Sequence, residues 1–367
     1  MYRVHITPHL SIEAPGHRGL NSRVLELLLQ VEQCGSLAAA CAAMDLSYRH
    51  AWQLLQDGEA LLGQPLLRMA RGKGSTLTPL GERLAWAQRR MQARLSPLLA
   101  SLASELGAEI EKLTQPPSPH LRLHASHGFS VQALGECMAR EGLAHELRYC
   151  GNVEALEALA TGQCDIAGFH VPMGAYEKQA VAHYRPWLHA QRYRVIRLTL
   201  RRQGLMTRPG NPCQIHDVPD LAKPGVRFIN RQAGSGTRFL LDLMLRQHGI
   251  ASAAVAGYEQ CEFTHAAVAA FVASGMADAG MGIELPARQF GLDFIPLHME
   301  RYMLLCDASR IDTPAVQHML SLLQSPAYLH AISQLPGYEA DHPGRVQLLH
   351  ECLPSLAGVV DRSQKPI

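Results

Sequence analysis

The sequence predicts an α+β protein of several domains: a small N-terminal helical domain, one long helix and a C-terminal two-lobed α/β domain. Before residue 80, apolar residues recur at helical spacing between glycine and serine breaks. A long run with few helix breakers follows, and after residue 120 strand-like and helix-like segments alternate. We expect the domains to span residues 1–79, 80–119 and 120–367.

The composition is that of globular domains, since 47% of the 367 residues are hydrophobic and 18% are charged. No window approaches the roughly 18 uninterrupted apolar residues of a membrane helix. The N-terminus lacks a basic segment followed by an apolar one, as a secretion signal would have. We therefore expect a cytoplasmic protein with no membrane partner.

The sequence lacks the motifs of redox cysteine pairs, of metal sites and of common catalytic centres. Nine cysteines are scattered without a C-x-x-C pair, which predicts free thiols buried as small hydrophobic side chains. The 19 histidines show no H-E-x-x-H spacing, so no metal site is expected. No G-x-S-x-G elbow and no paired carboxylates within one motif occur, so we expect no catalytic residues and no enzyme.

The N-terminal domain is predicted from apolar spacing and helix caps. Apolar residues between Val24 and Val31 share one face of a helix that ends at Gly35. Ser36 caps a short alanine-rich helix, and a turn leads to Ser47, the N-cap of a third helix. Two short helices joined by a few turn residues form a helix-turn-helix.

The third helix and the hairpin after it form the expected DNA interface, because the second helix of such a motif presents its N-terminal residues to the major groove. A short strand, a basic glycine-punctuated tip and a return strand follow as a wing. Between Ser47 and Arg94, eight Lys or Arg face three acids, which suits a polyanion or a solvated basic face. The predicted DNA contacts are Ser47, Tyr48, Arg49, His50, Trp52, Gln53, Arg71, Lys73 and Ser75.

The stretch "GSLAAACAAMDLSYRHAWQLLQDGEALLGQPLLRMARGKGSTLTPLGERL" resembles the winged helix-turn-helix of LysR-type regulators, and more closely that of the molybdate-responsive, ModE-like regulators. The resemblance covers residues 21–113. It implies that the long helix after Pro79 is a linker that pairs two subunits, whereas packing on its own domain is the alternative. The implied partners are double-stranded DNA and further copies of the chain, as a homodimer or homotetramer.

After the Pro-rich "TQPPSPH", the alternating strands and helices predict a largely parallel sheet in two lobes. Lobe I spans about residues 120–200 and 300–350, and lobe II about 204–298. The chain is expected to cross between the lobes at 193–212 and to return at 292–306. The segment after Pro336 is expected to form a helix and a tail.

This layout resembles the type 2 periplasmic-binding-protein fold of LysR-type effector domains. The stretches "QGLMTRPGNP", "NRQAGSGTRFLLD", "GYEQCEFTHAAVAAFVASGMADAGMGIE" and "LDFIPLHMERY" resemble the domain fused to ModE-type regulators and to molybdopterin-biosynthesis proteins. The resembling region, residues 121–305, implies a tetrahedral oxyanion effector, molybdate or tungstate. Relatives read "GSHD" where this chain has "ASHG" at Ala125–Gly128, so formate, sulfate or another anion stays open.

The anion is expected where strand ends and helix N-termini meet, because unpaired N–H groups there favour negative charge. The stretch "NRQAGSGTR" lacks the lysine of a phosphate loop, which leaves an anion-holding turn or a plain tight turn. Tyr258 and Glu284 are weaker candidates, and each histidine also has a structural interpretation. The predicted ligand-binding residues are Ser126, His127, Asn152, Val153, His170, Arg231, Gly234, Ser235, Gly236, Thr237, Arg238, Thr264, His265 and Tyr302.

Together these features predict a transcription regulator that senses a small oxyanion between its lobes and needs no cofactor besides that effector. The competing class is an enzyme or carrier of molybdenum-cofactor chemistry, whose N-terminal domain serves chiefly for dimerisation.

Overall fold

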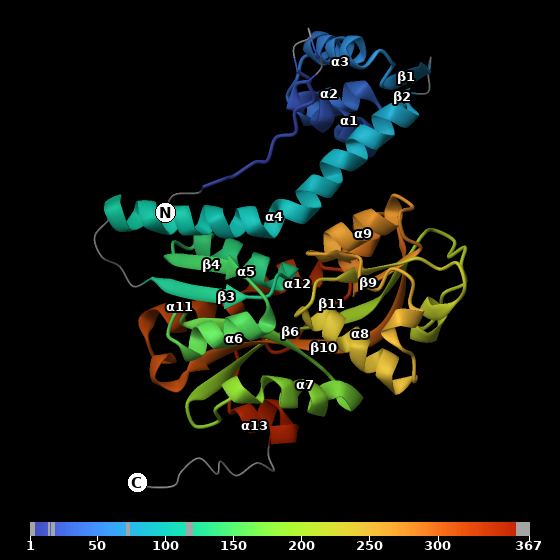
Figure 1. The fold of residues 1–367 in the computed structure, drawn as a ribbon. Helices are drawn as coiled ribbons and strands as arrows, with labels where there is room; N and C mark the ends of the chain where they lie inside the picture. The colour runs from blue at the N-terminus through green and yellow to red at the C-terminus, as the bar shows by residue number, and fades with distance from the viewer. Residues whose placement is uncertain (1–3, 14, 16–18, 71–73, 115–119, 357–367) are drawn as a thin grey trace. The chain divides into compact units, whose positions relative to one another are not determined.

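The computed structural model describes residues 4–13, 15, 19–70, 74–114 and 120–356 (Figure 1). The chain separates into two compact units, Thr7–Ser96 and Met1–Ile6 with Pro97–Ile367. The division falls within one long helix, α4 (Pro79–Thr114), at its internal proline Pro97.

The first unit is a three-helix domain with a hairpin, and the predicted helix-turn-helix is confirmed. Asn21, Ser36 and Ser47 cap the three helices with their side chains, and Gly35 ends the first helix with φ 71°. Buried leucines and alanines of these helices form one core with the hairpin and the start of α4. The elements are α1 (Ser22–Cys34), α2 (Leu37–Ala43), α3 (Tyr48–Leu62), β1 (Leu67–Ala70) and β2 (Gly74–Leu77).

The second unit is built on one mixed sheet with strand order β4-β3-β5-β10-β6-β9-β7-β8. The predicted two-lobed α/β domain is confirmed, but the expectation of a largely parallel sheet is wrong, because the two long strands that join the lobes pair antiparallel. The pairs β3–β4, β3–β5, β7–β8 and β7–β9 are parallel, and the pairs that involve β6 or β10 are antiparallel. The strands are β3 (Leu121–Ala125), β4 (His145–Tyr149), β5 (Ile166–Pro172), β6 (Tyr193–Thr207), β7 (Phe228–Arg231), β8 (Cys261–Glu262), β9 (Ala279–Ile283) and β10 (Asp293–Asp307).

Helices cover both faces of the sheet in both lobes. In lobe I, α5, α11 and α12 cover one face of β3–β5, and α6, α7 and α13 cover the other. In lobe II, α8 packs on one face of β7 and β9, and α9 and α10 on the other. The helices are α5 (Phe129–Arg140), α6 (Asn152–Ala160), α7 (Glu177–Tyr184), α8 (Gly236–Gln247), α9 (His265–Ala273), α10 (Glu284–Gln289), α11 (Pro314–Leu323), α12 (Pro326–Ser333) and α13 (Leu349–Cys352).

Two long strands, β6 and β10, join the lobes. They pair antiparallel from Asp293 opposite Thr207 to Asp307 opposite Tyr193, with register shifts between Pro296 and His298 and after Tyr302. One end of this ribbon pairs with β9 of lobe II, and the other end pairs with β5 of lobe I. The predicted crossings between the lobes are these two strands.

The C-terminal half of α4 docks on the outer edge of β4. Ser104 Oγ accepts the Leu147 N–H at 2.8 Å, and Ser101 Oγ accepts the Tyr149 N–H at 2.9 Å. Since an edge strand leaves a row of backbone groups unpaired, these hydroxyls satisfy two of them.

The segment after Pro336 corrects the sequence expectation, because it forms two strands before its helix. The strands β11 (Tyr338–Ala340) and β12 (Val346–Gln347) both pair with β6, and α13 follows. All nine cysteines are free thiols, of which five are buried and Cys34 is exposed. Among the described residues no single helix has the length and hydropathy of a membrane span, and α1 with α2 reaches them only as a pair bent by 114°.

Candidate functional site

Polar side chains of lobe I are held in place at the ends of β3 and β5. Ser126 Oγ lies 2.7 Å from His170 Nδ1, and the Tyr302 hydroxyl donates to the Ser126 carbonyl oxygen at 2.5 Å. The Tyr302 ring also lies against His170, with ring centroids 3.7 Å apart and ring planes tilted by 31°. His170 is 2% exposed, and its Nε2 has no hydrogen-bond partner in the described structure. The arrangement orients one unpaired histidine nitrogen.

The β6–β10 ribbon contributes a buried ionic cluster beside His170. Arg201 and Glu300 face each other across the strands, and Arg201 Nε donates to Glu300 Oε1. Gln203 Nε2 donates to the same Glu300 oxygen at 3.1 Å and to Thr237 Oγ1 of α8 at 3.0 Å. His170 Nε2 lies 4.0 Å from that oxygen. Gln203 therefore links the ribbon to the first turn of α8.

Helix N-termini from both lobes point to this cluster. Ser235 caps α8 by accepting the Arg238 N–H at 3.2 Å, and Thr264 caps α9 by accepting the Ala267 N–H at 2.9 Å. A Cβ atom at Gly236 would lie 2.9 Å from Asn152 Nδ2, at the N-terminus of α6 in the other lobe. The absent side chain at Gly236 thus lets two helix N-termini approach each other.

Several of these polar groups are buried without a partner. Within the described residues, His170 Nε2, His265 Nδ1, Arg201 Nη1 and the side-chain oxygens of Asn152 and Gln203 have no hydrogen-bond partner. Because an unpaired buried polar group costs about 1–3 kcal/mol, such a concentration of them indicates a site for a polar ligand. We call the following residues the inter-lobe cluster: Ser126, His127, Asn152, His170, Arg201, Gln203, Arg231, Ser235, Thr237, His265 and Glu300.

The charge of the inter-lobe cluster is positive. Burial, and then the positive charge of Arg201, lower the pKa of Arg231 to about 9. Arg231 donates to the Phe263 carbonyl oxygen at 3.0 Å and to Gln232 Oε1 at 3.3 Å, both of them neutral acceptors. A bound anion would stabilise the charged guanidinium and raise this pKa again.

The three histidines of the cluster are neutral at pH 7. Burial, and then the positive charges of Arg231 and Arg201, lower the pKa of His127 to about 4. The same causes hold the pKa values of His170 and His265 well below the usual histidine range. Since both arginines act on all three rings, these five side chains share one electrostatic environment. A neutral imidazole still offers one N–H to an anion.

Some predicted ligand-binding residues lie elsewhere or act indirectly. Arg238 is turned outward, since it forms an ion pair with Glu259 at 3.2 Å and covers the Tyr258 ring at 4.5 Å. The Val153 side chain packs on a hydrophobic core, so only its backbone can serve a ligand. Tyr302 acts indirectly, because its hydroxyl donates to the Ser126 carbonyl oxygen and its ring packs against His170.

Other candidates are structural as well. Tyr258 donates to Asp242 at 2.5 Å, and Glu284 forms ion pairs with Arg288 and Arg202. Gly234 has φ 81°, so it is needed for the turn that leads into α8.

Three members of the cluster, Arg201, Gln203 and Glu300, are not among the residues predicted from the sequence. A signal existed: Thr199, Arg201 and Gln203 alternate along a long strand of otherwise mostly apolar residues, and all three are buried. Alternate residues of a strand share one face, so three polar residues on one buried face mark a polar site. Glu300 lies in the other crossing strand, and only the register of β6 with β10 brings it to Arg201.

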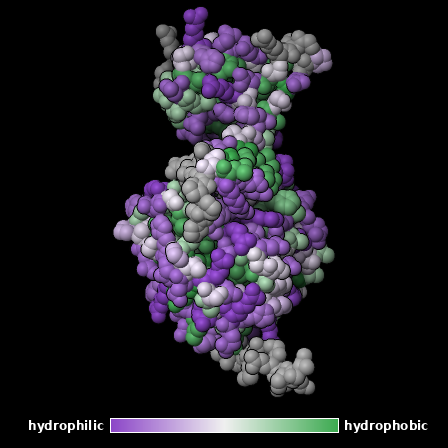
Figure 2. Space-filling model, turned by 90° about the vertical axis from the view of Figure 1, so that its left-hand side faces the viewer, coloured by the Kyte–Doolittle hydropathy of each residue, from purple (hydrophilic) through white to green (hydrophobic). Residues whose placement is uncertain are grey.

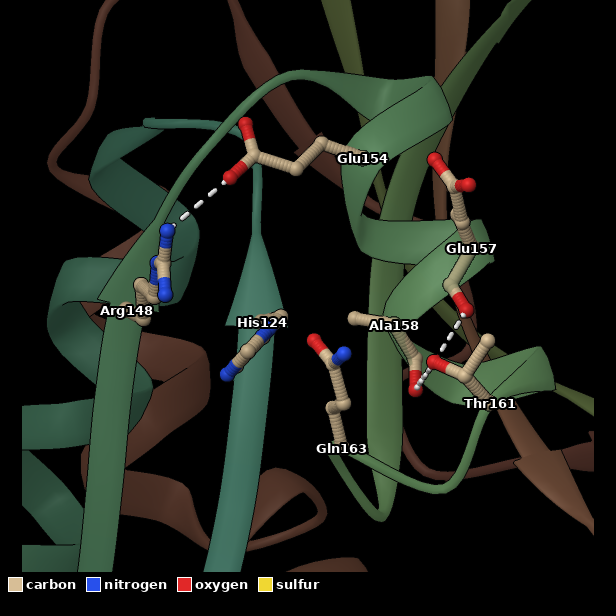
Figure 3. Close-up of a pocket in the computed structure, with 7 residues that line it drawn as sticks. All are labelled: His124, Arg148, Glu154, Glu157, Ala158, Thr161 and Gln163. Atoms are coloured by element: carbon tan, nitrogen blue, oxygen red, sulfur yellow. Dashed lines mark hydrogen bonds and ion pairs between the residues drawn. The ribbon is translucent and has the colours of Figure 1, made fainter.

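A second polar hollow of about 260 Å³ lies in lobe I between β3, β4 and α6 (Figure 3). Its one cation among the described lining residues, Arg148, pairs with Glu154 at 3.1 Å, and the Thr161 hydroxyl donates to the Glu157 backbone carbonyl oxygen at 2.9 Å (Figure 3). The convergent unpaired donors lie in the inter-lobe cluster instead. No group of three or more His, Cys, Asp or Glu side chains among the described residues is placed to hold a metal ion.

In the first unit, the N-terminal turns of α3 present an exposed polar surface. Tyr48 and Trp52 are 47% and 40% exposed, and Arg49 and His50 are exposed beside them. Ser47 caps the helix by accepting the His50 N–H at 3.2 Å, and Gln53 donates to Asp57 at 2.8 Å. These side chains are available to a partner.

The hairpin corrects one predicted DNA contact. Ser75 is 3% exposed, and its Oγ accepts the Leu37 N–H at 3.3 Å, so it joins the hairpin to α2. The prediction that this hydroxyl contacts DNA is therefore wrong. Arg71 and Lys73, predicted at the hairpin tip, lie outside the described residues.

Two parts of the chain match known protein families. Residues 135–324, which are 190 of the 367 residues, match the family described as "PBP superfamily domain". Residues 22–82 match "Bacterial regulatory helix-turn-helix protein, lysR family".

Two curated relatives and a solved structure are similar to parts of the chain. The uncharacterized protein YvgK of Bacillus subtilis is 34% identical over 205 residues, 55% of this chain and 65% of YvgK. The molybdenum-pterin-binding protein MopB of Rhodobacter capsulatus is 32% identical over 157 residues, 41% of this chain and 56% of MopB. The chain thus spans less than two thirds of either relative.

Among solved structures, the OxyR C206 mutant of Corynebacterium glutamicum aligns over 86% of this chain and 95% of its own, with 15% identity and a TM-score of 0.43. The family of the chain is assigned from its sequence matches to the two families. The helix-turn-helix and the two-lobed domain described above agree with those matches. The chain belongs to the PBP superfamily and carries an N-terminal helix-turn-helix of the lysR family of bacterial regulatory proteins.

Proposed function

We propose that this chain is a LysR-type transcription regulator that binds a small oxyanion, with molybdate or tungstate favoured, in the inter-lobe cluster. The observation that carries the proposal is the set of buried, unpartnered polar groups contributed by both lobes around Arg231. Binding of an anion between the lobes would favour the state in which they are closed.

Charge supports an anion as the ligand. Arg201 is paired with Glu300, which leaves Arg231 as a buried guanidinium whose contacts are neutral. Hydroxyls of Ser235 and Thr237 and the N-termini of α6, α8 and α9 add donors that suit an oxyanion. At the Ser126–His170 pair, either the Ser126 hydroxyl or His170 Nε2 can donate to the anion, depending on the histidine tautomer. Donors that approach from several elements fit a tetrahedral ligand better than a flat one.

The choice of molybdate or tungstate rests on sequence similarity. MopB, whose name describes a molybdenum-pterin-binding protein, is 32% identical to part of this chain. Sulfate has the same charge and shape as molybdate, and formate carries one charge less. These anions are therefore the comparison set for any binding experiment.

The proposed DNA interface is the exposed start of α3, with Tyr48, Arg49, His50, Trp52 and Gln53, and the cap Ser47 beside them. Arginine, asparagine and glutamine side chains read base edges in the major groove, and hydroxyls hold phosphates. Arg71 and Lys73 remain proposed contacts of the wing.

A homodimer or homotetramer is proposed from α4. Leu98, Leu102 and Leu106 follow one another at four-residue spacing and are 57%, 44% and 43% exposed. Figure 2, which views α4 from its C-terminal end, shows hydrophobic side chains gathered on this helix. Such a stripe is typical of a helix that pairs with another.

Two measurements test the proposal. Calorimetry with molybdate, tungstate, sulfate and formate at constant ionic strength should show binding, and we expect the highest affinity for molybdate or tungstate. A labelled fragment of the protein's own upstream region should shift in a gel with submicromolar protein, and the effector should change that affinity. If no anion binds the folded protein, the sensor is refuted; if anions bind but DNA does not, the enzyme or carrier class gains support.

A further inference from the structure

The inter-lobe cluster contains one carboxylate among its donors. Glu300 is 1% exposed, and its Oε1 accepts hydrogen bonds from Arg201 and Gln203 and lies 4.0 Å from His170 Nε2. These three side chains come from β6 and β5, and Gln203 bonds onward to Thr237 of α8. One internal carboxylate oxygen thus gathers donors that an external anion could use.

A buried carboxylate at an anion site has a calculable consequence. With neutral histidines, Arg201, Arg231 and Glu300 leave the cluster a net charge of +1; without the carboxylate charge it would be +2. The electrostatic free energy of a ligand is proportional to its own charge. A carboxylate beside the site therefore weakens the binding of a dianion by twice the free energy that it costs a monoanion.

We propose that Glu300 is a specificity-determining residue of this site: it acts as an internal competitor for the anion, lowers the affinity for anions, and sets the balance between divalent and monovalent ones. This inference rests on the proposed function of the site. It explains why a buried acid stands among groups that otherwise favour negative charge, and it makes Arg201 and Gln203 ligand-binding residues.

Glu300→Gln tests the inference because an amide oxygen can still accept from Arg201 and Gln203 while the charge is lost. We expect the affinity for formate to rise about threefold, and the affinities for sulfate and molybdate about tenfold, since the second factor is the square of the first. Calorimetry at pH 7.5 and constant ionic strength measures all three. Glu300→Asp keeps the charge and should retain the wild-type ratio of sulfate to formate affinity.

Glu284→Gln is the matched control, since Glu284 is a buried carboxylate (4% exposed) with arginine partners outside the cluster. It should leave every affinity unchanged. Affinities of Glu300→Gln that are equal to the wild type, lower, or raised by the same factor for all anions would overturn the role of Glu300 while the proposed function stands. Absence of binding by both folded proteins would overturn the proposed function itself.

Should Glu300→Gln not fold, Gln203→Lys gives a second test, because an ammonium group can donate to Glu300 and Thr237 as the amide does while it adds one positive charge to the cluster. It should raise sulfate affinity about tenfold and formate affinity about threefold. A sulfate-to-formate ratio equal to that of the wild type would overturn the inference.

Discussion

Ser235 and Thr237 each keep an O–H group for a ligand. Ser235 Oγ accepts the Arg238 N–H, and Thr237 Oγ1 accepts from Gln203. We predict that Ser235→Ala combined with Thr237→Ala weakens molybdate binding at least tenfold, because a hydrogen bond to a charged group contributes about 1.5–3 kcal/mol. Calorimetry measures the loss.

Ser325 provides the matched control at the residue scale. It caps α12 by accepting the Tyr328 N–H at 3.2 Å, the same distance as the bond that Ser235 accepts. Ser325→Ala should lower the free energy of unfolding by about 1 kcal/mol, as loss of a cap does, and leave the affinity unchanged. Equal loss of affinity in both variants would assign the effect to helix stability.

The lowered pKa values of the cluster histidines predict acid sensitivity of the C-terminal unit. The pKa of His127 falls from 6.5 in the unfolded chain to about 4 in the folded one, so the unfolded state binds more protons between these values. The contribution of His127 to the free energy of unfolding is therefore fully present above pH 6.5. It falls as the pH drops toward 4, by up to about 1.4 kcal/mol per pH unit.

Thermal melts of wild type and His127→Gln between pH 7.5 and 4.5 measure this dependence. The variant should show a shallower loss of stability, whereas replacement of the exposed His330 by Gln should not alter the slope. A slope unaffected by His127→Gln would contradict the prediction.

At the scale of elements, α3 is the part of the first unit that should read DNA. Arg49→Ala removes an exposed cation from its first turn and should weaken operator binding by about 1–3 kcal/mol if Arg49 contacts a base. Gel shifts at two salt concentrations distinguish a base contact from a phosphate contact, which alone reduces the salt dependence. Arg140→Ala, at an exposed position of α5, is the control and should bind DNA as the wild type does.

The docking of α4 on β4 makes a stability prediction. Ser101→Ala with Ser104→Ala leaves the N–H groups of Tyr149 and Leu147 without these acceptors, and should cost about 0.5–1.5 kcal/mol for each bond in denaturant unfolding. Ser333→Ala removes a hydroxyl that bonds only within its own helix and its adjoining turn, and should cost less. Equal losses would show that the bonds to β4 add no stability.

Elements with local signals were predictable, and those that depend on distant pairing were not. The caps Ser36 and Ser47 and the glycine at position 35 act within a few residues, so the sequence alone reveals α1 to α3. The strands β11 and β12 are short and are stabilised by pairing with β6, more than 130 residues earlier. Glu300 was missed for the same reason, since its role depends on the register with Arg201.

At the scale of the whole molecule, the two compact units should respond differently to the effector. Ligand that binds only the folded effector domain stabilises it by about 2.7 kcal/mol at a concentration of one hundred times Kd. We expect molybdate to raise the melting temperature of the unit Pro97–Ile367 in calorimetric scans and to leave the melting temperature of Thr7–Ser96 unchanged. A uniform shift of all transitions would mean that the units unfold together.

The burial of the inter-lobe cluster sets the timing of the response. Asn152, Arg201 and Thr237 are 2%, 3% and 3% exposed, and the α6 and α8 N-termini meet at Gly236. Because these groups are buried, we expect an anion to reach them when the lobes separate, and we expect association to be much slower than the roughly 10⁹ M⁻¹s⁻¹ limit of diffusion. We expect release to wait for the same opening. The occupancy of the site would then follow the anion concentration averaged over the time between openings, and brief changes in concentration would have little effect.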